Sequence, residues 1–325
     1  MNHKNLSHAA ATELAGKRVL VVHAHPDDEV LFTGGIIAEL TSGGAEVLIL
    51  TATLGEEGEV IGERYQHLAG SDLLGGFRIR ELQDAASAIG ARSEHLIAPG
   101  YLRDSGMVGS AAHAHPRALV NNVDEAAGGI EKHLAIFSPH AVITYGPDGG
   151  YGHPDHIAVH QATERACKAF GISNIWWTIY QREAIFAALE TVTPADGWEK
   201  PSADYLLNFT NAAYDLKLSL SDASYNAKIA GISAHPTQVW VGNGAVSETN
   251  PEPRWAVCSD PAVAPVAYAL SNNLVMPVIR AEYLQRSRGE NNPWPSDVEA
   301  HANRDHRAEQ EPLTGDVWKV FFDEQ

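Results

Sequence analysis

Residues 18–29 read RVLVVHAHPDDE, and this stretch decides the fold class. Its first six residues form a short apolar run rich in Val, which is typical of a buried strand. A helical pattern follows over residues 34–42, and a second apolar run, EVLILTAT, covers residues 46–53. The stretch therefore begins a strand, helix, strand unit.

The same alternation recurs in the middle of the chain. The apolar run AVITY at 141–145 follows a helical segment near 119–137 and precedes a second helix, which begins near His156 and ends at Gly171. Strands that alternate with helices predict an α/β fold, here a Rossmann-like, mainly parallel sheet with helices on both faces. Ligands in such folds bind beyond the carboxyl ends of the strands.

A change of composition after residue 190 predicts a boundary, because the segment TVTPADGWEKPSADY is rich in Pro, Asp and Gly. The expected parts are an N-terminal extension at 1–17, an α/β core at 18–190, and a smaller C-terminal α+β part at 191–325 that packs on the core and completes the pocket. The C-terminal part is expected to hold a helix at 222–234, apolar segments near 255–280 and a polar surface loop at 286–316.

Charge and hydropathy exclude several classes of partner. The chain has 23 basic and 41 acidic side chains, for a net charge of −18, which repels phosphate backbones and anionic membranes. No apolar run resembles a signal-peptide core or a membrane span. We therefore expect no nucleic-acid or membrane partner and a cytoplasmic location, while the oligomeric state stays open. Cys167 and Cys258 are expected to be reduced, buried thiols.

Two segments share the triplet His-Pro-Asp, AHPDDE at 24–29 and GYGHPDH at 150–156, and each lies just beyond a predicted strand. Parallel strands end at the same edge of a sheet, so the two segments are expected to face one another. Proline fixes the direction of each strand-to-helix turn. A dinucleotide site is disfavoured because the first turn lacks a Gly-x-Gly-x-x-Gly fingerprint.

The two triplets together supply a set of zinc ligands. Catalytic zinc usually takes three protein ligands from His and carboxylates and leaves one position for water. His25, Asp28 and His156 provide two imidazoles and one carboxylate. Asp27, next to a ligand but on another side of the backbone, remains free to accept a proton from that water. The sequence thus predicts a metal hydrolase with one Zn²⁺ per chain.

Three further residues complete the predicted catalytic group. Tyr151 and His153 are candidates to polarise a carbonyl or stabilise an oxyanion, and Asp155 is a candidate to orient an imidazole by accepting its N–H. Either Asp27 or His153 can deliver the proton to the leaving group. Chance neighbours are common among 16 histidines, so the prediction depends on the two triplets following two strands.

The pair AHPDDE and GHPDH resembles the LmbE-like and PIG-L-like zinc de-N-acetylases. The resemblance covers about three quarters of the chain, and it implies that the ligands, the base and the oxyanion residues of the family fall on the positions just named. Segments similar to the deacetylases of mycothiol biosynthesis are TLGEEGEVIGER at 53–64, GGFRIREL at 75–82, RDSGM at 103–107, TYGPDGGYGHPDH at 144–156, AHPTQV at 234–239 and SNNLVMPV at 271–278.

This resemblance implies hydrolysis of the acetamide of 1-(2-acetamido-2-deoxy-α-D-glucopyranosyl)-myo-inositol to acetate and the free amine. It also implies that Arg78 and Asp104 contact the sugar or inositol hydroxyls, although their residue types alone equally fit a surface ion pair or a loop cap. One alternative is a mycothiol S-conjugate amidase, against which GEEGEVIGER argues. Another is a non-catalytic sugar-binding protein, against which the presence of Asp27 and all three ligands argues.

The remaining histidines of interest have plainer expectations. His235 precedes Pro236 at the predicted end of a helix, where a capping role is expected. The resemblance moves AHPTQV toward the rim of the pocket without giving it a chemical role. His113 and His115 lie among Ala, Gly and Ser with no strand before them, and a solvated loop is expected there.

Overall fold

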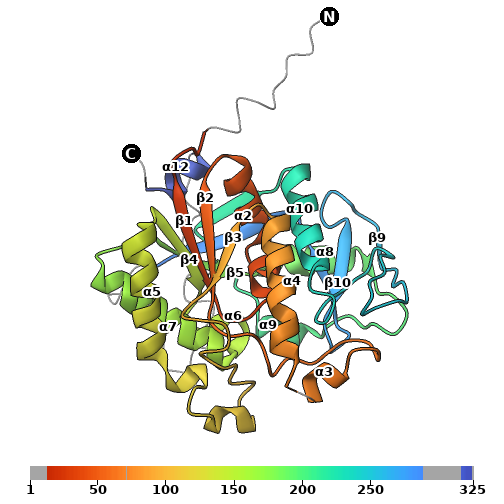
Figure 1. Cartoon of the computed structure of the whole chain (residues 1–325). Helices are drawn as coiled ribbons and strands as arrows, with labels where there is room; N and C mark the ends of the chain where they lie inside the picture. Colours follow the sequence, from red (N-terminus) through yellow and green to blue (C-terminus); the bar gives the residue numbers. More distant parts are fainter. Residues whose placement is uncertain (1–12, 71, 288–315, 324–325) are drawn as a thin grey trace, which may run out of the picture.

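The computed structural model describes residues 13–70, 72–287 and 316–323, and in these residues a seven-stranded sheet runs in the order β3-β2-β1-β4-β5-β12-β7 (Figure 1). The strands from β3 to β5 are parallel, and β12 pairs antiparallel with both β5 and β7. The strands of this sheet are β1 (Arg18–His23), β2 (Glu46–Thr51), β3 (Arg92–His95), β4 (Ala141–Tyr145), β5 (Ile175–Ile179), β7 (Leu216–Ser219) and β12 (Ala281–Arg286).

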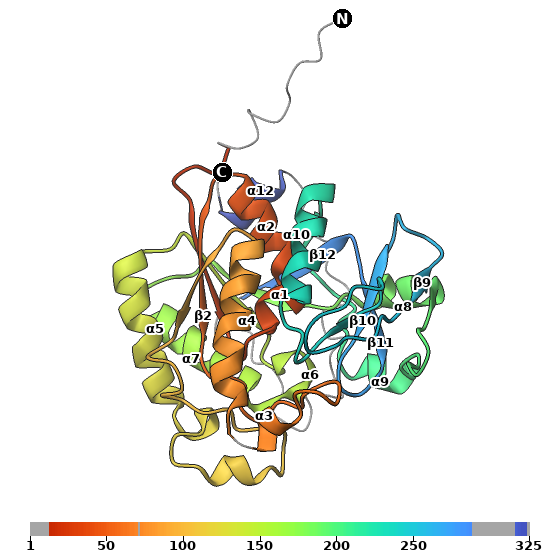
Figure 2. The ribbon, with the colours of Figure 1, turned by 45° about the vertical axis from the view of Figure 1, so that its right-hand side comes forward.

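Helices cover both faces of the sheet, as expected for a mainly parallel sheet. Helices α5 and α7 pack together on one face, while α10 packs against α2 and α4 on the other (Figures 1 and 2). The helices are α1 (Asp28–Leu31), α2 (Gly34–Ser42), α3 (His67–Gly70), α4 (Leu74–Ala88), α5 (Val123–Phe137), α6 (Gly149–Gly152), α7 (Pro154–Ala169), α8 (Arg182–Glu190), α9 (Ala203–Leu207), α10 (Asp222–Ser233) and α12 (Val317–Phe321), with 3₁₀ turns at Ala111–Ala114 and Leu119–Asn121.

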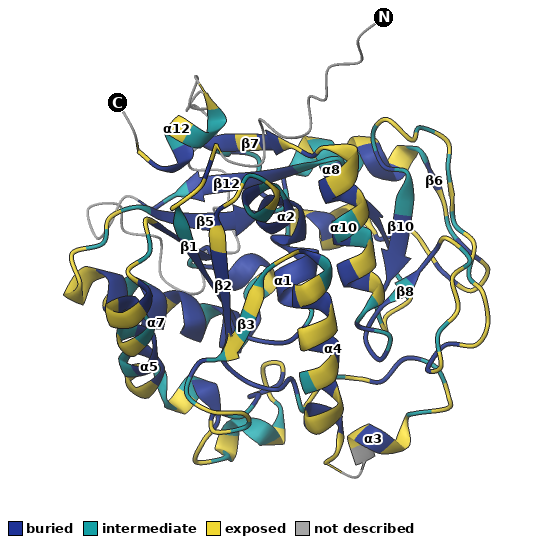
Figure 3. Cartoon of the chain, turned by 45° about the horizontal axis from the view of Figure 1, so that its top comes forward, coloured by how far each residue is buried: buried dark blue, intermediate teal, exposed yellow. Residues whose placement is uncertain are grey.

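Burial explains why the apolar runs form the centre of the sheet. Strands β4 and β5 are buried at every position, and β1 and β2 at all but the first residue (Figure 3). Such runs have no polar face to turn toward water, so they are stable only between two helical layers. The α/β fold class predicted from the alternation of strands and helices is confirmed.

The chain beyond residue 190 also forms small antiparallel sheets beside the main one. Strand β10 lies between β11 and β8, and β6 pairs with β9. The short strands are β6 (Val192–Thr193), β8 (Trp240–Val241), β9 (Val257–Cys258), β10 (Val266–Ala269) and β11 (Val275–Val278). Since β7 and β12 join the main sheet, this part of the chain is continuous with the core. The boundary at 190/191 stays a prediction, as does the cytoplasmic location.

The structure also tests the expectations for the two cysteines and for His113 and His115. Cys167 is buried, whereas Cys258 is only half-buried, so the expectation of burial holds for one thiol of the two. His113 lies on the 3₁₀ turn Ala111–Ala114, and His115 follows that turn. Both side chains are half-buried, whereas a solvated loop was expected. Most of the polar segment 286–316, and residues 1–12 of the expected extension, lie outside the described residues.

Among the residues that the structure describes, no helix is both long enough and apolar enough to cross a membrane.

Candidate active site

The first His-Pro-Asp turn follows β1 and carries two carboxylates that contact different groups. Asp27 has a φ of 105°, a backbone conformation that costs a residue with a side chain about 1–3 kcal/mol. Its N–H donates to Glu29 Oε2 at 2.9 Å. Asp28 begins α1, and its Oδ2 accepts the His25 N–H at 2.9 Å and the Tyr145 hydroxyl at 2.6 Å. This turn therefore holds two adjacent carboxylates apart.

The second turn connects β4 to α7 through the short helix α6, at the same end of the sheet (Figure 1). Asp155 is fully buried, and its Oδ2 accepts the Ser105 N–H at 2.9 Å. Gly149 has a φ of 63°, and a Cβ at this residue would lie 2.9 Å from the Cβ of His156. Only glycine therefore lets the loop pass this close to His156.

The two turns bring His25, Asp28 and His156 together. The distances are 3.3 Å from His25 Nδ1 to His156 Nε2, 3.5 Å from His25 Nδ1 to Asp28 Oδ2, and 3.4 Å from His156 Nε2 to Asp28 Oδ1. A tetrahedral ion with bonds of ~2.0–2.1 Å needs its donor atoms about 3.3 Å apart. The separations thus fit a metal ion bound by these three side chains.

Each imidazole has an inner nitrogen, which faces the cluster, and an outer nitrogen, which faces away from it. The hydrogen bond of the outer nitrogen decides which of the two carries the proton. His156 Nδ1 donates to the Gly149 carbonyl at 3.0 Å, and His25 Nε2 donates to Asp155 Oδ2 at 3.2 Å. The inner nitrogens are therefore left with lone pairs that face each other and Asp28. Such an arrangement is repulsive without a positive charge between the donors, and metal-bound histidines are oriented by outer partners of this kind.

The electrostatics of the cluster favour positive charge. Burial alone would lower the pKa of His25, but the carboxylates of Asp104, Asp155 and Asp28 outweigh it and hold that pKa well above 6.5. Burial would likewise raise the pKa of Asp28, yet His156 and His25 hold it well below its usual value. Carboxylates thus surround the imidazoles, as a site for a divalent cation requires.

Other donor sets lie nearby. Ring nitrogens of His25, His153 and His156 come within 4.8 Å of one another, as do ligand atoms of His25, Asp104 and Asp155. His153 caps α7 by accepting the Asp155 N–H on Nδ1 at 3.2 Å, which leaves only Nε2 for any other contact. In the set with Asp28 all three separations, 3.3, 3.4 and 3.5 Å, fit a tetrahedral ion, and the assignment of ligands stays a prediction.

Asp27 lies outside the cluster and contacts Arg78. Arg78 Nη2 is 3.1 Å from Asp27 Oδ2, and the guanidinium also donates to the carbonyls of Gly55, at 2.9 Å, and Pro26. Burial raises the pKa of Asp27 to about 6, against the opposing effect of Arg78. Arg78 itself is buried rather than part of a surface ion pair.

A cavity of about 550 Å³ opens beside the cluster. Its walls include predicted site residues, namely His25, Asp27, Asp28, Arg78, Asp104, Tyr151 and His153. Asp155 and His156 lie behind this wall, fully buried. An aromatic side of the cavity is formed by Phe32, Tyr180, Tyr205, Phe209 and Tyr268, and polar groups come from Glu57, Gln238 and Asn272.

Three residues of the site escaped the sequence analysis. Tyr145 was expected only as part of a strand, but it joins the Ala24 N–H to Asp28 through its hydroxyl and stacks on the His156 ring at 4.1 Å. Glu29 and His235 form a fully buried pair with Nε2 and Oε1 2.6 Å apart. The capping role expected for His235 is wrong, because its side chain turns inward to Glu29. Two features of the sequence could have indicated these residues. Tyr145 is a polar residue at the end of an apolar strand, and His235 lies in the motif AHPTQV.

Comparison with known proteins agrees with this geometry. The family model described as PIG-L, GlcNAc-PI de-N-acetylase, matches residues 20–167. A 1D-myo-inositol 2-acetamido-2-deoxy-alpha-D-glucopyranoside deacetylase of Corynebacterium efficiens is 43% identical over 295 residues, covering 90% of this chain and 94% of the relative. A Rhodococcus jostii protein of the same name is 39% identical, covering 85% and 93%.

The structure of a deacetylase–teicoplanin complex from the teicoplanin biosynthesis pathway aligns with a TM-score of 0.49 and 18% identity, covering 84% of this chain and 99% of that one.

The sequence relatives decide the class: the chain belongs to the PIG-L, or LmbE-like, family of deacetylases. The predicted family and the prediction of a hydrolase are thereby confirmed, and the His and Asp cluster of this chain is able to hold a metal ion.

Proposed function

We propose that the protein hydrolyses the acetamide of 1-(2-acetamido-2-deoxy-α-D-glucopyranosyl)-myo-inositol, giving acetate and the free amine in mycothiol biosynthesis. The names of relatives that align over most of this chain support this substrate. The observation that carries the proposal is the convergence of His25, Asp28 and His156 beside Asp27, at the wall of a cavity of about 550 Å³. Metal-assisted hydrolysis of an amide needs the metal ligands and a base at one point.

One zinc ion per chain is the proposed cofactor, held by His25 Nδ1, His156 Nε2 and the carboxylate of Asp28. When bound, zinc supplies Lewis-acid activation of water and of the amide carbonyl. Asp155 is proposed to keep His25 in the tautomer that offers Nδ1, since its carboxylate accepts the proton on Nε2.

Asp27 is the proposed general base. As the water oxygen bonds to the carbonyl carbon, Asp27 takes the proton that the water loses. When the bond between carbon and nitrogen then breaks, the same carboxyl group returns that proton to the leaving nitrogen. His153 is the other candidate for this acid. Burial and the imidazoles of His25 and His156 lower the pKa of His153 to about 2, so its ring is neutral and carries no extra proton to give. Asp27 is therefore the proposed acid.

His153 and Tyr151 are proposed to stabilise the oxyanion. Because His153 Nδ1 accepts the Asp155 N–H, the proton of the neutral ring is on Nε2 and available to a developing negative oxygen. The centroids of the Tyr151 and His156 rings are 5.0 Å apart, and Tyr151 belongs to the same wall of the cavity as His153.

Acetate release from the inositol glycoside, measured with and without a chelator, tests the function. We expect release that stops on metal removal and returns with zinc. Binding of the glycoside without acetate release would indicate a sugar-binding protein. Faster cleavage of a mycothiol S-conjugate than of the acetamide would indicate the amidase.

Asp104 and Arg78 are proposed substrate contacts, and their variants are expected to behave differently. Asp104 faces the cavity without touching Asp27, so Asp104→Ala should lower kcat/KM for the inositol glycoside more than for plain N-acetylglucosamine, which lacks inositol. Arg78 also touches Asp27, so Arg78→Ala should lower kcat for both substrates. Zinc content should stay intact in both variants. Equal losses for both substrates in Asp104→Ala would remove Asp104 from inositol recognition.

A further inference from the structure

The buried pair of Glu29 and His235 is connected to the backbone of Asp27. One carboxylate oxygen of Glu29, Oε1, lies 2.6 Å from His235 Nε2, and the other, Oε2, accepts the Asp27 N–H at 2.9 Å. Both Glu29 and His235 have no exposed surface. A continuous path of two hydrogen bonds therefore runs from His235 to the residue proposed as the base.

This path acts on a residue with an unfavourable backbone. Asp27 has a φ of 105°, and a side chain in that region persists only where the surroundings hold it. The N–H bond to Glu29 fixes the peptide plane that sets this φ. Arg78 fixes the other end of the residue by its contact with the carboxylate at 3.1 Å. The Asp27 carbonyl also accepts the N–H groups of Val30 and Leu31, at 3.1 and 3.0 Å. The position of Asp27 thus depends on the contacts of its backbone with α1 and Glu29 and on the contact of its carboxylate with Arg78.

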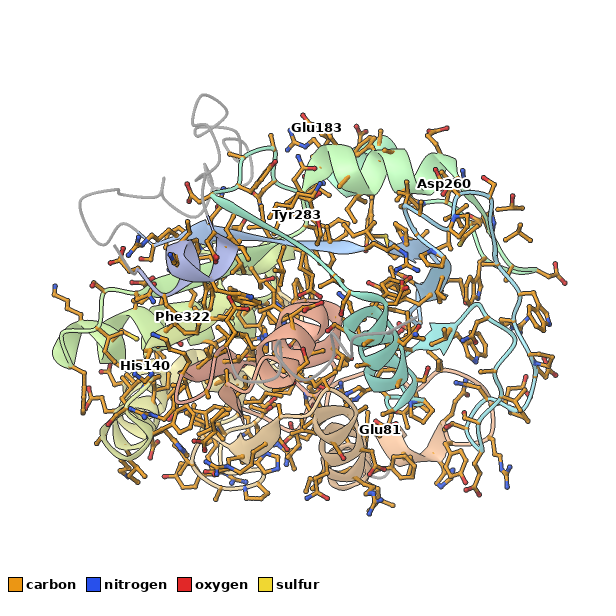
Figure 4. All side chains as sticks on the ribbon, turned by 90° about the horizontal axis from the view of Figure 1, so that it is seen from above. Glu81, His140, Glu183, Asp260, Tyr283 and Phe322 are labelled. Atoms are coloured by element: carbon orange, nitrogen blue, oxygen red, sulfur yellow. The ribbon has the colours of Figure 1, made fainter. Side chains whose placement is uncertain are left out.

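The segment that supplies His235 is itself held in place. It follows α10, and its Thr237 donates both its N–H, at 2.9 Å, and its hydroxyl, at 2.7 Å, to the carboxylate of Glu81 on α4. Glu81 lies where α4 meets the chain after α10 (Figure 4). Thr237 also accepts the Ile61 N–H through its carbonyl at 2.8 Å. The segment is therefore a rigid support for the His235 ring.

Glu29 depends on His235 for its orientation. In the part of the chain that the structure describes, His235 Nδ1 has no hydrogen-bond partner, so Glu29 is the one polar contact of the ring. A carboxylate without exposed surface that lost this donor would be left incompletely paired. It would rotate, and its bond to the Asp27 N–H would weaken.

We infer that His235 is a positioning residue for the deacetylation, which holds Asp27 in its reactive orientation through Glu29. The inference rests on the proposed function of Asp27 as the base. His235 touches no substrate in this role, and a small displacement of the base is enough to slow the reaction, since about 1 Å costs roughly 10²-fold.

The experiment compares His235→Ala, His235→Gln, Asp27→Asn and the double variant Asp27→Asn/His235→Ala, with acetate release from the inositol glycoside as the assay. His235→Ala is expected to lower kcat about 10- to 100-fold, with KM and zinc content nearly unchanged. His235→Gln should recover most of the rate, because its amide N–H can donate to Glu29. The double variant should be no slower than Asp27→Asn, since no base remains to be positioned.

Tyr225→Phe is the matched control. It removes a buried hydrogen bond from α10, in which the Tyr225 hydroxyl donates to the Val278 carbonyl at 2.8 Å, without touching Glu29 or the segment of His235. This variant should therefore lower Tm while kcat stays within about twofold. If His235→Ala does not fold, Glu29→Gln takes its place, because a neutral amide oxygen cannot fully serve both donors. A full kcat in folded His235→Ala, or losses that multiply in the double variant, would overturn the inference. A full kcat in Asp27→Asn alone would instead overturn the proposed base.

Discussion

Asp27→Asn is expected to keep its zinc and to lose about 10²- to 10⁴-fold in kcat, the usual contribution of a general base. The amide has the shape of the carboxylate but cannot accept the proton that the attacking water loses. The three proposed ligands should be undisturbed, because Asp27 contacts Arg78 and Glu29 rather than the imidazoles. The measurements are steady-state acetate release and elemental analysis of the same preparation.

Asp84→Asn provides a control for the change of charge. Asp84 pairs with Arg80 on the exposed side of α4, with 2.8 Å between Arg80 Nε and Asp84 Oδ2, and exposed pairs contribute little to stability. This variant should retain its full rate. Near-normal turnover of zinc-loaded Asp27→Asn would remove Asp27 from the chemistry, whereas loss of zinc in that variant would place Asp27 among the ligands.

The centre of the fold could be predicted from the sequence because its signals are local. The runs at 18–23 and 141–145 are mostly apolar, and the structure ends both strands at the predicted residues. Proline at position 154 marks the start of α7, where a fixed φ and a missing N–H suit the first helical turn. The meeting of the two turns then followed from the geometry of parallel strands.

Contacts between distant segments could not be predicted in the same way. His235 and Glu29 are separated by 206 positions, and the pattern around His235 is that of an ordinary helix end. Strand β12 enters the main sheet antiparallel to β5, which alternation of strands and helices does not specify. Such contacts depend on how the C-terminal segments pack on the finished core, and one sequence carries no local signal for that packing.

Arg78 shows the same limit at the level of one side chain. Its residue type fitted a surface ion pair, a loop cap or a contact with hydroxyl groups. The structure excludes the surface ion pair, because the guanidinium is buried against Asp27 and two backbone carbonyls. A charged group becomes tolerable inside a protein only when its partners are already in place. Those partners come from the turn after β1 and the loop after β2, which meet Arg78 of α4 only in the folded chain.

His156→Ala is expected to abolish tight zinc binding and, with it, acetate release. Two of the three proposed donors would remain, and the lost imidazole is the one on α7 that closes the cluster opposite the first turn. An incomplete set of ligands binds zinc weakly, because each missing donor must be replaced by water. Elemental analysis after dialysis measures the loss directly. Thermal unfolding measures it independently, because bound metal raises the Tm of the native protein.

His160→Gln is the matched control, since His160 lies one turn further along α7 and is equally a buried imidazole. Its Nδ1 donates to the Tyr145 carbonyl at 3.0 Å, outside the cluster, so its loss should cost stability without costing zinc. Zinc should therefore raise the Tm of His160→Gln as it does that of the unaltered protein, and leave the Tm of His156→Ala unchanged. Undiminished zinc in His156→Ala would favour the set in which His153 replaces it, because His153 offers the nearest other imidazole to His25, with 4.6 Å between ring centroids.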